Sequence, residues 1–294
     1  MTTSLAKTIV ATGVSSGLGL EAVRQLLTEA QPYRIILGAR DVPRTKSSYD
    51  ALTYDRTKHN VSILQLDLGN LREVKSFAQN VLTELGATKI DYLLLNAAIT
   101  NPSEEANRFG SKWSESFIVN HLSGHYLLHL LKDKLIESQA RVVVVSSGAV
   151  RIVEDPSVIE REMKAGSGAG GREVYADTKF TQLLGAHWWR RQLSGKCTVV
   201  AVSPGLIPGT GLGIGLGPAL PPQAMADAKS IPEGAGNILR ALTRDDFPED
   251  PEQIFLTSWG EWWPKDVYAK SLDRDLQKKF CPGKEDIERE ERID

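Results

Sequence analysis

The sequence has few cysteines and no long apolar run. Cys197 and Cys281 are the two cysteines among 294 residues, too few and too isolated for a disulfide framework or a thiolate metal site. No stretch approaches the roughly 18 continuous apolar residues that a membrane-spanning helix needs. The first residues lack the basic flank and long apolar segment of a secretory signal. These absences predict a protein of a reducing compartment, cytoplasmic and without a membrane partner.

The sequence also lacks an excess of either charge. Its 35 Lys and Arg residues face 37 Asp and Glu residues, for a net charge of −2. There is therefore no basic surplus to attract nucleic acid or acidic lipid, and we expect neither as a partner. The hydrophobic fraction of 41% and the charged fraction of 24% are ordinary for globular proteins, which excludes disordered and fibrous classes.

What the sequence does contain is a regular alternation of two patterns. Short apolar, β-branched runs alternate with longer amphipathic segments, as in a parallel sheet covered by helices on both faces. The runs are 8–11, 34–37, 61–66, 92–95, 142–145, 198–202 and 254–257, and the helical patterns include 18–30, 70–86, 108–138 and 173–194. This predicts an α/β fold with a doubly wound seven-stranded parallel sheet, a single Rossmann domain over 1–264. Residues 265–294 are strongly charged, and we expect an extension that ends as a helix and a loose tail.

One loop interrupts the alternation. Residues 204–222 are dense in glycine and proline, and a long loop inside a compact domain is more often a functional cover than a spacer. We therefore expect a lid over 205–230.

A glycine-rich turn follows the first predicted strand and opens the first predicted helix. Such a turn lets backbone N–H groups and the helix N-terminus approach a pyrophosphate, which a mere surface turn would not do. The cofactor-binding residues predicted here are Gly13, Ser15, Ser16, Gly17, Leu18 and Gly19. The spacing Gly-x-x-x-Gly-x-Gly with a preceding Thr resembles the short-chain dehydrogenase/reductase family.

The end of the second strand indicates which nicotinamide cofactor is bound. An acidic residue here would bind the adenosine ribose diol and repel a 2′-phosphate. Ala39 stands at that place, and Arg40 follows it. A guanidinium can give a phosphate two parallel hydrogen bonds, so we predict NADP(H). The alternative is a surface Arg40 paired with Asp41.

The resemblance continues through the next two strands and the following helix. Asp67 and Leu68 resemble the family's adenine-contacting pair. Asn96, Ala97 and Ala98 resemble the Asn-Ala-Ala variant of the protochlorophyllide-reductase-like branch. The run beginning at Asn120 resembles retinol dehydrogenases, and the resemblance implies that Asn120 supports a proton relay. His121, His125 and His129 share one helix face, but we expect no metal there, because no carboxylate or thiolate ligand is suggested nearby.

Three residues form the predicted catalytic set. Ser147 ends the fifth strand, at the edge where open α/β sheets bind ligands. Tyr175 and Lys179 are four residues apart on a helix, hence on one face. Because free tyrosine has a pKa of about 10, we expect the nearby cation to lower it toward the working range. The resemblance implies that Ser147 binds the carbonyl, Tyr175 protonates the alkoxide and Lys179 holds the nicotinamide ribose.

A Pro-Gly turn completes the resemblance. Pro204, Gly205 and Ile207 resemble the segment that packs on the nicotinamide. The family has threonine five residues after the proline, where this chain has Gly209, and Thr210 comes one residue later. Either Thr210 replaces that threonine through a looser loop, or the contact is missing.

Together these residues imply NADPH-dependent reduction of a ketone or aldehyde. Alternatives are NADP-dependent alcohol oxidation and a non-catalytic NADP(H)-binding sensor or scaffold. The resemblance to fungal members implies a hydrophobic, small-molecule carbonyl substrate in secondary-metabolite biosynthesis. The aromatic run 187–191 is typical of either a homodimer interface or internal packing. The tryptophans of 259–263 could close over the substrate or cover the core.

Overall fold

A computed structural model describes residues 5–212 and 228–293 of the chain. The larger part of the expected lid, residues 213–227, lies outside the described residues.

Seven parallel strands form one sheet, as predicted. Each neighbouring pair runs parallel, in the order β3-β2-β1-β4-β5-β6-β7. The apolar residues of six strands are buried on both faces, as sandwiched strands must be, whereas β3 at the edge of the sheet is only half-buried. The strands are β1 (Lys7–Thr12), β2 (Tyr33–Ala39), β3 (Asn60–Gln65), β4 (Tyr92–Leu95), β5 (Arg141–Val145), β6 (Thr198–Val202) and β7 (Phe255–Leu256).

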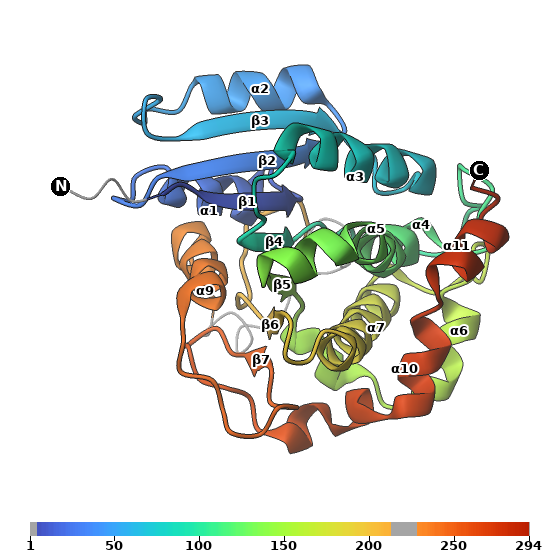
Figure 1. Ribbon diagram of the computed structural model, residues 1–294. Coiled ribbons are helices and arrows are strands. Elements are labelled where there is room, and N and C mark those ends of the chain that lie inside the picture. Colours follow the sequence, from blue (N-terminus) through green and yellow to red (C-terminus); the bar gives the residue numbers. More distant parts are fainter. Residues whose placement is uncertain (1–4, 213–227, 294) are drawn as a thin grey trace.

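Helices cover both faces of this sheet (Figure 1). One apolar cluster joins a face of the sheet to α1 and α9, and a second cluster joins the other face to α3, α5 and α7. The longer helices are α1 (Gly17–Leu26), α2 (Val42–Asp50), α3 (Leu71–Leu85), α5 (Ser123–Ser138), α7 (Gly171–Gln192) and α9 (Ile231–Thr243). The shorter helical segments are α4 (Glu115–Phe117), the π-helical turn η1 (Ile118–Leu122), η2 (Gly148–Ile152), η3 (Pro156–Val158) and α6 (Ile159–Glu162).

The strand order reverses direction between β1 and β4. The register pairs Thr12 with Leu95, so the glycine turn after β1 and Asn96 after β4 emerge at the same edge. Open α/β sheets bind ligands in the crevice at such a reversal. The fold therefore brings the predicted cofactor motifs together.

The helix predicted over 108–138 begins later than expected. Gly110 has a φ of 79°, which interrupts a right-handed helix. Ser114 then caps the new helix, because its hydroxyl accepts a hydrogen bond from the Phe117 N–H at 3.3 Å. Residues 101–114 instead form a segment tied to the chain before α7, with Ser103 N–H bonded to the Ala169 carbonyl at 3.0 Å.

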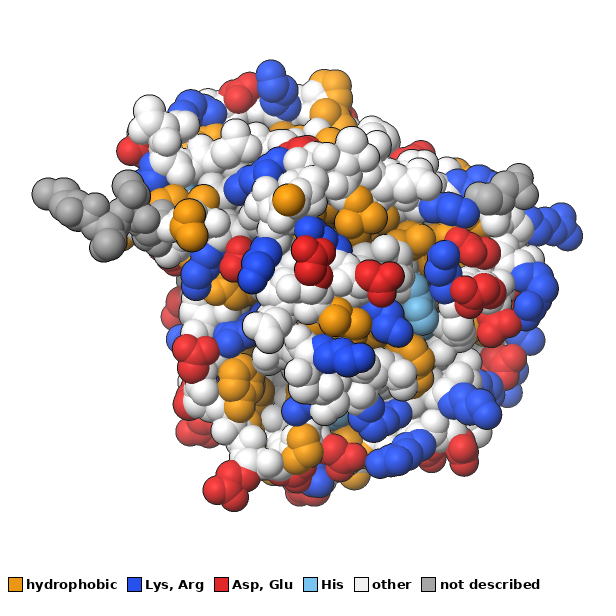
Figure 2. All heavy atoms as spheres, viewed as in Figure 1, with side chains coloured by type: hydrophobic (Ala, Val, Ile, Leu, Met, Phe, Trp, Pro, Cys, Tyr) orange, Lys and Arg blue, Asp and Glu red, His pale blue; other side chains and the backbone are white. Residues whose placement is uncertain are grey.

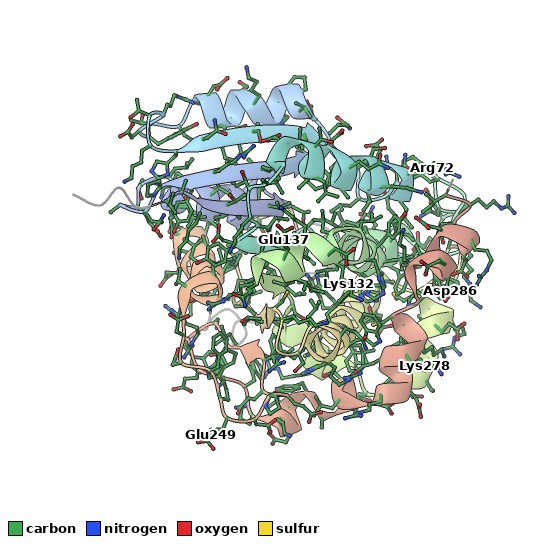
Figure 3. The ribbon with its side chains drawn as sticks, in the orientation of Figure 1. Arg72, Lys132, Glu137, Glu249, Lys278 and Asp286 are labelled. Atoms are coloured by element: carbon green, nitrogen blue, oxygen red, sulfur yellow. The ribbon has the colours of Figure 1, made fainter. Side chains whose placement is uncertain are left out.

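The expectation of a loose C-terminal tail is wrong. Residues 265–290 form η5 (Lys265–Leu272), α10 (Arg274–Phe280) and α11 (Lys284–Glu290), which wrap the side of α7 and α5 (Figure 1). Phe280 and Ile287 are buried against the main core, so the charged sequence conceals an apolar face. Charged side chains such as Lys278 and Asp286 point outward (Figure 3).

Histidines of α5 and the preceding turn anchor this C-terminal segment. His121 Nε2 lies 2.7 Å from the Phe280 carbonyl, and His125 Nε2 lies 2.8 Å from the Pro282 carbonyl. The Trp189 indole donates to His125 Nδ1 at 2.9 Å. Burial lowers the pKa of His121 to about 4, so it is neutral near pH 7. The shared histidine face is thus a packing surface.

The surface agrees with the balanced composition. In Figure 2 acidic and basic side chains are interspersed over the visible face, without a field of one sign. Across the described part of the chain, no helix is both long and apolar enough to cross a membrane.

Candidate active site

A cleft of about 530 Å³ opens at the carboxyl edge of the sheet, where the strand order reverses. It lies between the glycine turn, the tip of β2 and the segments that follow β3 and β4. Twelve predicted cofactor residues line it: Gly13, Ser15, Ser16, Gly17, Leu18, Gly19, Arg40, Asp67, Leu68, Asn96, Ala97 and Thr210. The glycine turn, the tip of β2 and the residues after β3 and β4 line it together, which suits a dinucleotide.

The glycines of the turn are required by their surroundings. A Cβ atom on Gly19 would lie 2.2 Å from the Gly13 carbonyl oxygen, and one on Gly13 would lie 2.4 Å from Ala97 Cα. Gly13 and Gly17 also have φ values of 67° and 55°, a region that side chains disfavour. The turn packs closely onto β4 and leaves the N-terminus of α1 free to face an anion.

Two polar side chains fix the glycine turn through hydrogen bonds to its backbone carbonyls. Asn96 Nδ2 donates to the Gly13 carbonyl at 2.6 Å. The Tyr49 hydroxyl, from α2, donates to the Val14 carbonyl at 2.7 Å in a buried contact. Asn96 therefore has a structural role in joining β4 to the turn. Its pairing with the turn fixes the floor of the cleft before any ligand enters.

At the tip of β2, Arg40 is exposed and lines the cleft. The alternative pairing with Asp41 is not what the geometry gives, because the Asp41 carboxylate caps α2 by accepting the Arg44 N–H at 2.9 Å. Asp50, at the end of α2, is paired with Lys46 at 3.9 Å. No ion pair of Arg40 occurs within the described residues, so its guanidinium is open to a ligand phosphate.

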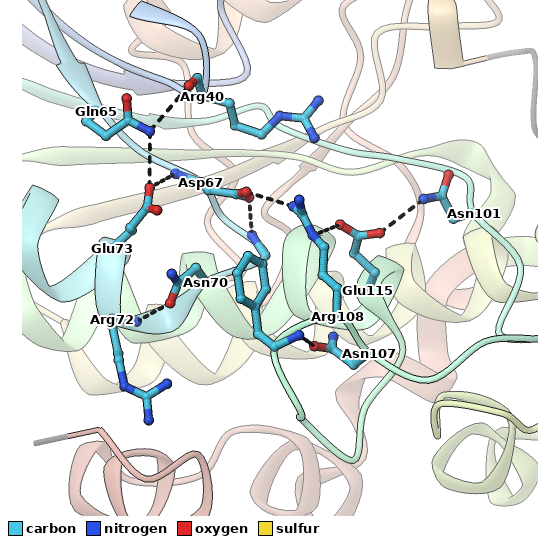
Figure 4. A network of polar contacts seen from close by, with 12 residues as sticks. Arg40, Gln65, Asp67, Asn70, Arg72, Glu73, Asn101, Asn107, Arg108 and Glu115 are labelled. Carbon is cyan, nitrogen blue, oxygen red and sulfur yellow. Dashed lines mark hydrogen bonds and ion pairs between the residues drawn. The ribbon is translucent and has the colours of Figure 1, made fainter.

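Asp67, at the end of β3, belongs to a polar network that closes the same end of the cleft (Figure 4). Its carboxylate accepts the Gly69 N–H at 2.9 Å and pairs with the Arg108 guanidinium at 2.7 Å. Arg108 also pairs with Glu115 at 2.9 Å. The segment before α4 is thereby fastened across the cleft at the side of the predicted adenine contact.

The predicted catalytic side chains meet at the end of β5. The Tyr175 phenol interacts with the Ser147 side chain, which favours the ionised form of the phenol. Lys179 Nζ lies 5.8 Å from the centre of the Tyr175 ring and donates to the Val145 carbonyl at 2.8 Å and to Gln182 at 3.0 Å. Ser146 points away from this group, because its hydroxyl donates to the Lys179 carbonyl at 3.1 Å. Helix α7 and β5 thus bring a hydroxyl, a phenol and an amine together.

The expected lowering of the Tyr175 pKa does not follow from this geometry. Burial raises the pKa of Tyr175, and the interaction with Ser147 opposes that rise only in part. Burial also lowers the pKa of Lys179 to about 7, so the ammonium charge beside the phenol is partial at neutral pH. Tyr175 is therefore protonated near pH 7, which suits a proton donor.

Asn120 lies in the π-helical turn η1, buried beside the same group. Its Oδ1 accepts the Ile99 N–H at 2.8 Å, and its Nδ2 donates to the Ile99 carbonyl and to Thr178, each at 2.9 Å. Both N–H donors and the oxygen of the side chain join the segment after β4 to α7. The irregular turn is the kind of feature that recurs at functional sites.

The Pro-Gly turn after β6 lies beside the cleft rather than in it. Asn237 Nδ2 of α9 donates to the Pro204 carbonyl at 3.0 Å and fixes the turn. Gly205 has a φ of 104°, which favours glycine. Thr210 lies against the glycine turn, where a Cβ on Gly17 would be 3.9 Å from its methyl group.

The structure brings most of the predicted residues together at one edge. Those that do not line the cleft itself are Asn120, Ser147, Tyr175, Lys179, Pro204, Gly205 and Ile207. The sequence reasoning missed lining residues that follow Asn96 or flank the other motifs: Gly38, Leu66, Ile99, Thr100, Asn101, Val119, Gly211 and Leu212. Ile99 to Asn101 could have been found from their place after the fourth strand. The described residues contain no cluster of three side chains able to hold a metal.

Comparison with known proteins decides the family. The short chain dehydrogenase model matches residues 7–156. This chain belongs to the short-chain dehydrogenase family. Short-chain dehydrogenase/reductase GME11359 of Pestalotiopsis microspora is 54% identical over 98% of this chain and 100% of that protein. Retinol dehydrogenase 12 of Homo sapiens is 30% identical over 68% of this chain and 61% of its own length.

The solved structures similar to this short-chain dehydrogenase support its fold. NADPH-bound carbonyl reductase from chicken fatty liver matches with a TM-score of 0.67 at 19% identity, over 88% of this chain and 98% of that one. An alcohol dehydrogenase from Thermococcus sibiricus matches with a TM-score of 0.61 at 21% identity, over 86% and 96%. The predicted fold and the retinol-dehydrogenase-like branch are confirmed, and the protein is an oxidoreductase of this family.

Proposed function

We propose that this short-chain dehydrogenase reduces the carbonyl of a ketone or aldehyde to an alcohol, with NADPH as the hydride donor. The observation that carries the proposal is the meeting of Ser147, Tyr175 and Lys179 at the end of β5, where Lys179 Nζ lies 5.8 Å from the centre of the Tyr175 ring and donates to the Val145 carbonyl. A protonated phenol beside a second hydroxyl can bind a carbonyl oxygen and neutralise the alkoxide that forms on it.

The cleft fits a dinucleotide on the features of this chain alone. The crowding at Gly13 and Gly19 leaves backbone N–H groups exposed to a pyrophosphate. The Arg40 guanidinium, which forms no ion pair in the described part of the chain, is available to a 2′-phosphate, and the Asp67 network borders the adenine side. When bound, NADPH would supply the hydride.

The protein side of the reaction consists of positioning and proton transfer. Ser147 holds the substrate oxygen beside the Tyr175 hydroxyl, which gives its proton to that oxygen. Lys179 keeps its amine at the end of β5 through Val145 and Gln182. Buried Asn120 keeps the end of β4 joined to α7 and so preserves these distances.

The test is NADPH oxidation with a panel of aromatic and aliphatic ketones. We expect Tyr175→Phe to lower kcat by roughly 10²- to 10⁴-fold, the usual contribution of an acid catalyst, with NADPH affinity unchanged by fluorescence. Tyr54→Phe, remote from the cleft, is the matched control and should keep full activity. Unchanged turnover by Tyr175→Phe would contradict the acid, and equal affinity for NADH and NADPH would contradict the role of Arg40.

The proposal also includes parts that rest on resemblance. A hydrophobic substrate from secondary metabolism and a cytoplasmic location stay predictions. A homodimer through 187–191 also stays a prediction, although His187 and Trp189 are buried within their own chain. Those two side chains are therefore packing residues, and the half-buried Trp188, Arg190 and Arg191 are what remain of the run for an interface.

A further inference from the structure

A loop of aromatic residues follows β7 and stands beside the catalytic serine. The chain turns back on itself, with the Trp263 N–H bonded to the Phe255 carbonyl at 2.8 Å. The Trp263 ring stacks on the Phe255 ring at 5.5 Å and is buried. Trp259, at the tip of the loop, lies 5.9 Å from Trp263 yet is 61% exposed. The buried Trp263 ring thus supports the exposed Trp259 ring at the surface.

The loop is close to the reacting groups. Gly148 directly follows Ser147, and a Cβ on Gly148 would lie 3.8 Å from the edge of the Trp263 ring. The same atom would lie 3.4 Å from the Arg151 guanidinium. Trp263 and Arg151 therefore border the residue next to the predicted carbonyl-binding hydroxyl.

Arg151 supplies a cation beside the Trp263 ring. Its Nε donates to the Gly148 carbonyl at 3.1 Å, and its guanidinium carbon lies 4.8 Å from the centre of the Trp263 ring. In the parts of the chain that the structure covers, no carboxylate forms an ion pair with it. The backbone bond and the ring contact fix the guanidinium in place while its other N–H groups stay exposed.

Other charged side chains also lie near the loop, and two of them, Arg240 and Arg244, contact Gly260 within it. Glu261 accepts the Trp259 indole N–H at 3.1 Å, which orients the exposed ring. A Cβ placed on Gly205 would lie 3.2 Å from Lys229 Cγ and 3.1 Å from Ser258 Cβ. Lys229 therefore lies beside the start of the loop. Because cationic side chains outnumber acidic ones among the described residues around the loop, the local charge favours an anionic ligand.

We propose that Trp259 and Arg151 form the substrate subsite next to Ser147, and that the substrate is a flat aromatic ketone carrying an ionised oxygen, either a carboxylate or a phenolate. The aromatic body stacks on Trp259, and the anionic oxygen accepts hydrogen bonds from Arg151. This inference rests on the proposed carbonyl reduction, since it names the substrate class of that same site.

Binding without turnover tests the subsite separately from the reaction. Protein saturated with NADP⁺ is titrated by calorimetry with para-acetylbenzoate, with its uncharged amide and with the corresponding cyclohexane carboxylate. We expect the carboxylate to bind at least tenfold more tightly than the amide, and several-fold more tightly than the non-aromatic acid. Para-hydroxyacetophenone, measured below and above the pKa of its phenol, distinguishes a phenolate from a carboxylate substrate.

Variants assign the two preferences to their residues. Arg151→Gln should bring the ratio between carboxylate and amide close to one, and Arg151→Lys should keep part of it. Trp259→Ala should remove the preference for the aromatic acid while the charge preference stays. Arg56→Gln, an exposed arginine in the loop before β3, is the matched control. Equal wild-type affinities, or a ratio that survives Arg151→Gln, would overturn the subsite. If the wild-type protein shows these binding ratios but reduces no ketone, the subsite stands and the reductase proposal is overturned.

Discussion

Asp177 lies between Tyr175 and Lys179 on α7, and its replacement by asparagine gives a quantitative test of the packing there. The side chain is 6% exposed, and its Oδ2 is buried without a hydrogen-bond partner among residues 5–212 and 228–293. Burial, together with the nearby carboxylates of Glu162 and Glu173, raises the pKa of Asp177 from 3.8 to about 7. The folded protein therefore resists ionisation of this group far more than the unfolded chain does.

The sign and size of the effect follow from linkage. An acid whose pKa is raised by folding stabilises the fold at low pH, and that stability is lost as the pH rises from about 4 to about 7. A shift of about three units at 1.36 kcal/mol each gives an upper bound of about 4 kcal/mol, which incomplete burial reduces to about 2 kcal/mol. An asparagine side chain cannot ionise, so Asp177→Asn should remove this loss.

Urea unfolding at pH 5 and pH 8.5 measures the difference. We expect the stability of Asp177→Asn relative to wild type to grow by about 1–2 kcal/mol between the two values. Asp155→Asn is the control, because hydrogen bonds from Ser157 hold the pKa of Asp155 below its ordinary value. A relative stability of Asp177→Asn that does not change with pH would refute the reasoning.

Two further predictions concern the cofactor cleft. Gly19→Ala should weaken NADPH binding by more than tenfold in fluorescence titration, because its Cβ would lie 2.2 Å from the Gly13 carbonyl oxygen; Gly236→Ala in α9, whose Cβ has no atom closer than 3.9 Å, should bind normally. Comparable affinities for the two variants would rule out the crowding argument. Arg108→Gln should raise the dissociation constant of NADPH several-fold with kcat unchanged, because Asp67 and Glu115 then lose their shared cation. A fall in kcat at saturating NADPH would show that Arg108 acts elsewhere.

The sheet and the cleft could be predicted because their signals are local. Each strand is an apolar run bounded by polar residues, and the glycine turn combines strand, turn and helix in neighbouring residues. The edge at which Ser147, Asn96 and the turn meet then follows from the parallel arrangement. These features need no knowledge of distant contacts.

Other features depend on residues far apart in the sequence. The sequence after residue 264 is mostly charged, so its apolar face is hard to predict. Phe280 and Ile287 become core residues only because this segment packs against α5 and α7. The pKa of Lys179 depends on its burial at the end of β5, which no spacing reveals. The helix start at Ser114 differs from the predicted one because the amphipathic pattern runs through Gly110, and the sequence alone does not show that this glycine adopts a positive φ.

The docking of residues 280–282 onto His121 and His125 has a consequence for how the enzyme matures. The carbonyls of Phe280 and Pro282 are synthesised after every strand of the sheet, yet they brace the turn that holds Asn120. Because domains fold as the chain emerges, the sheet can assemble first while this brace is still missing. The turn that holds Asn120 is therefore fully braced only after the chain has emerged from the ribosome as far as Pro282.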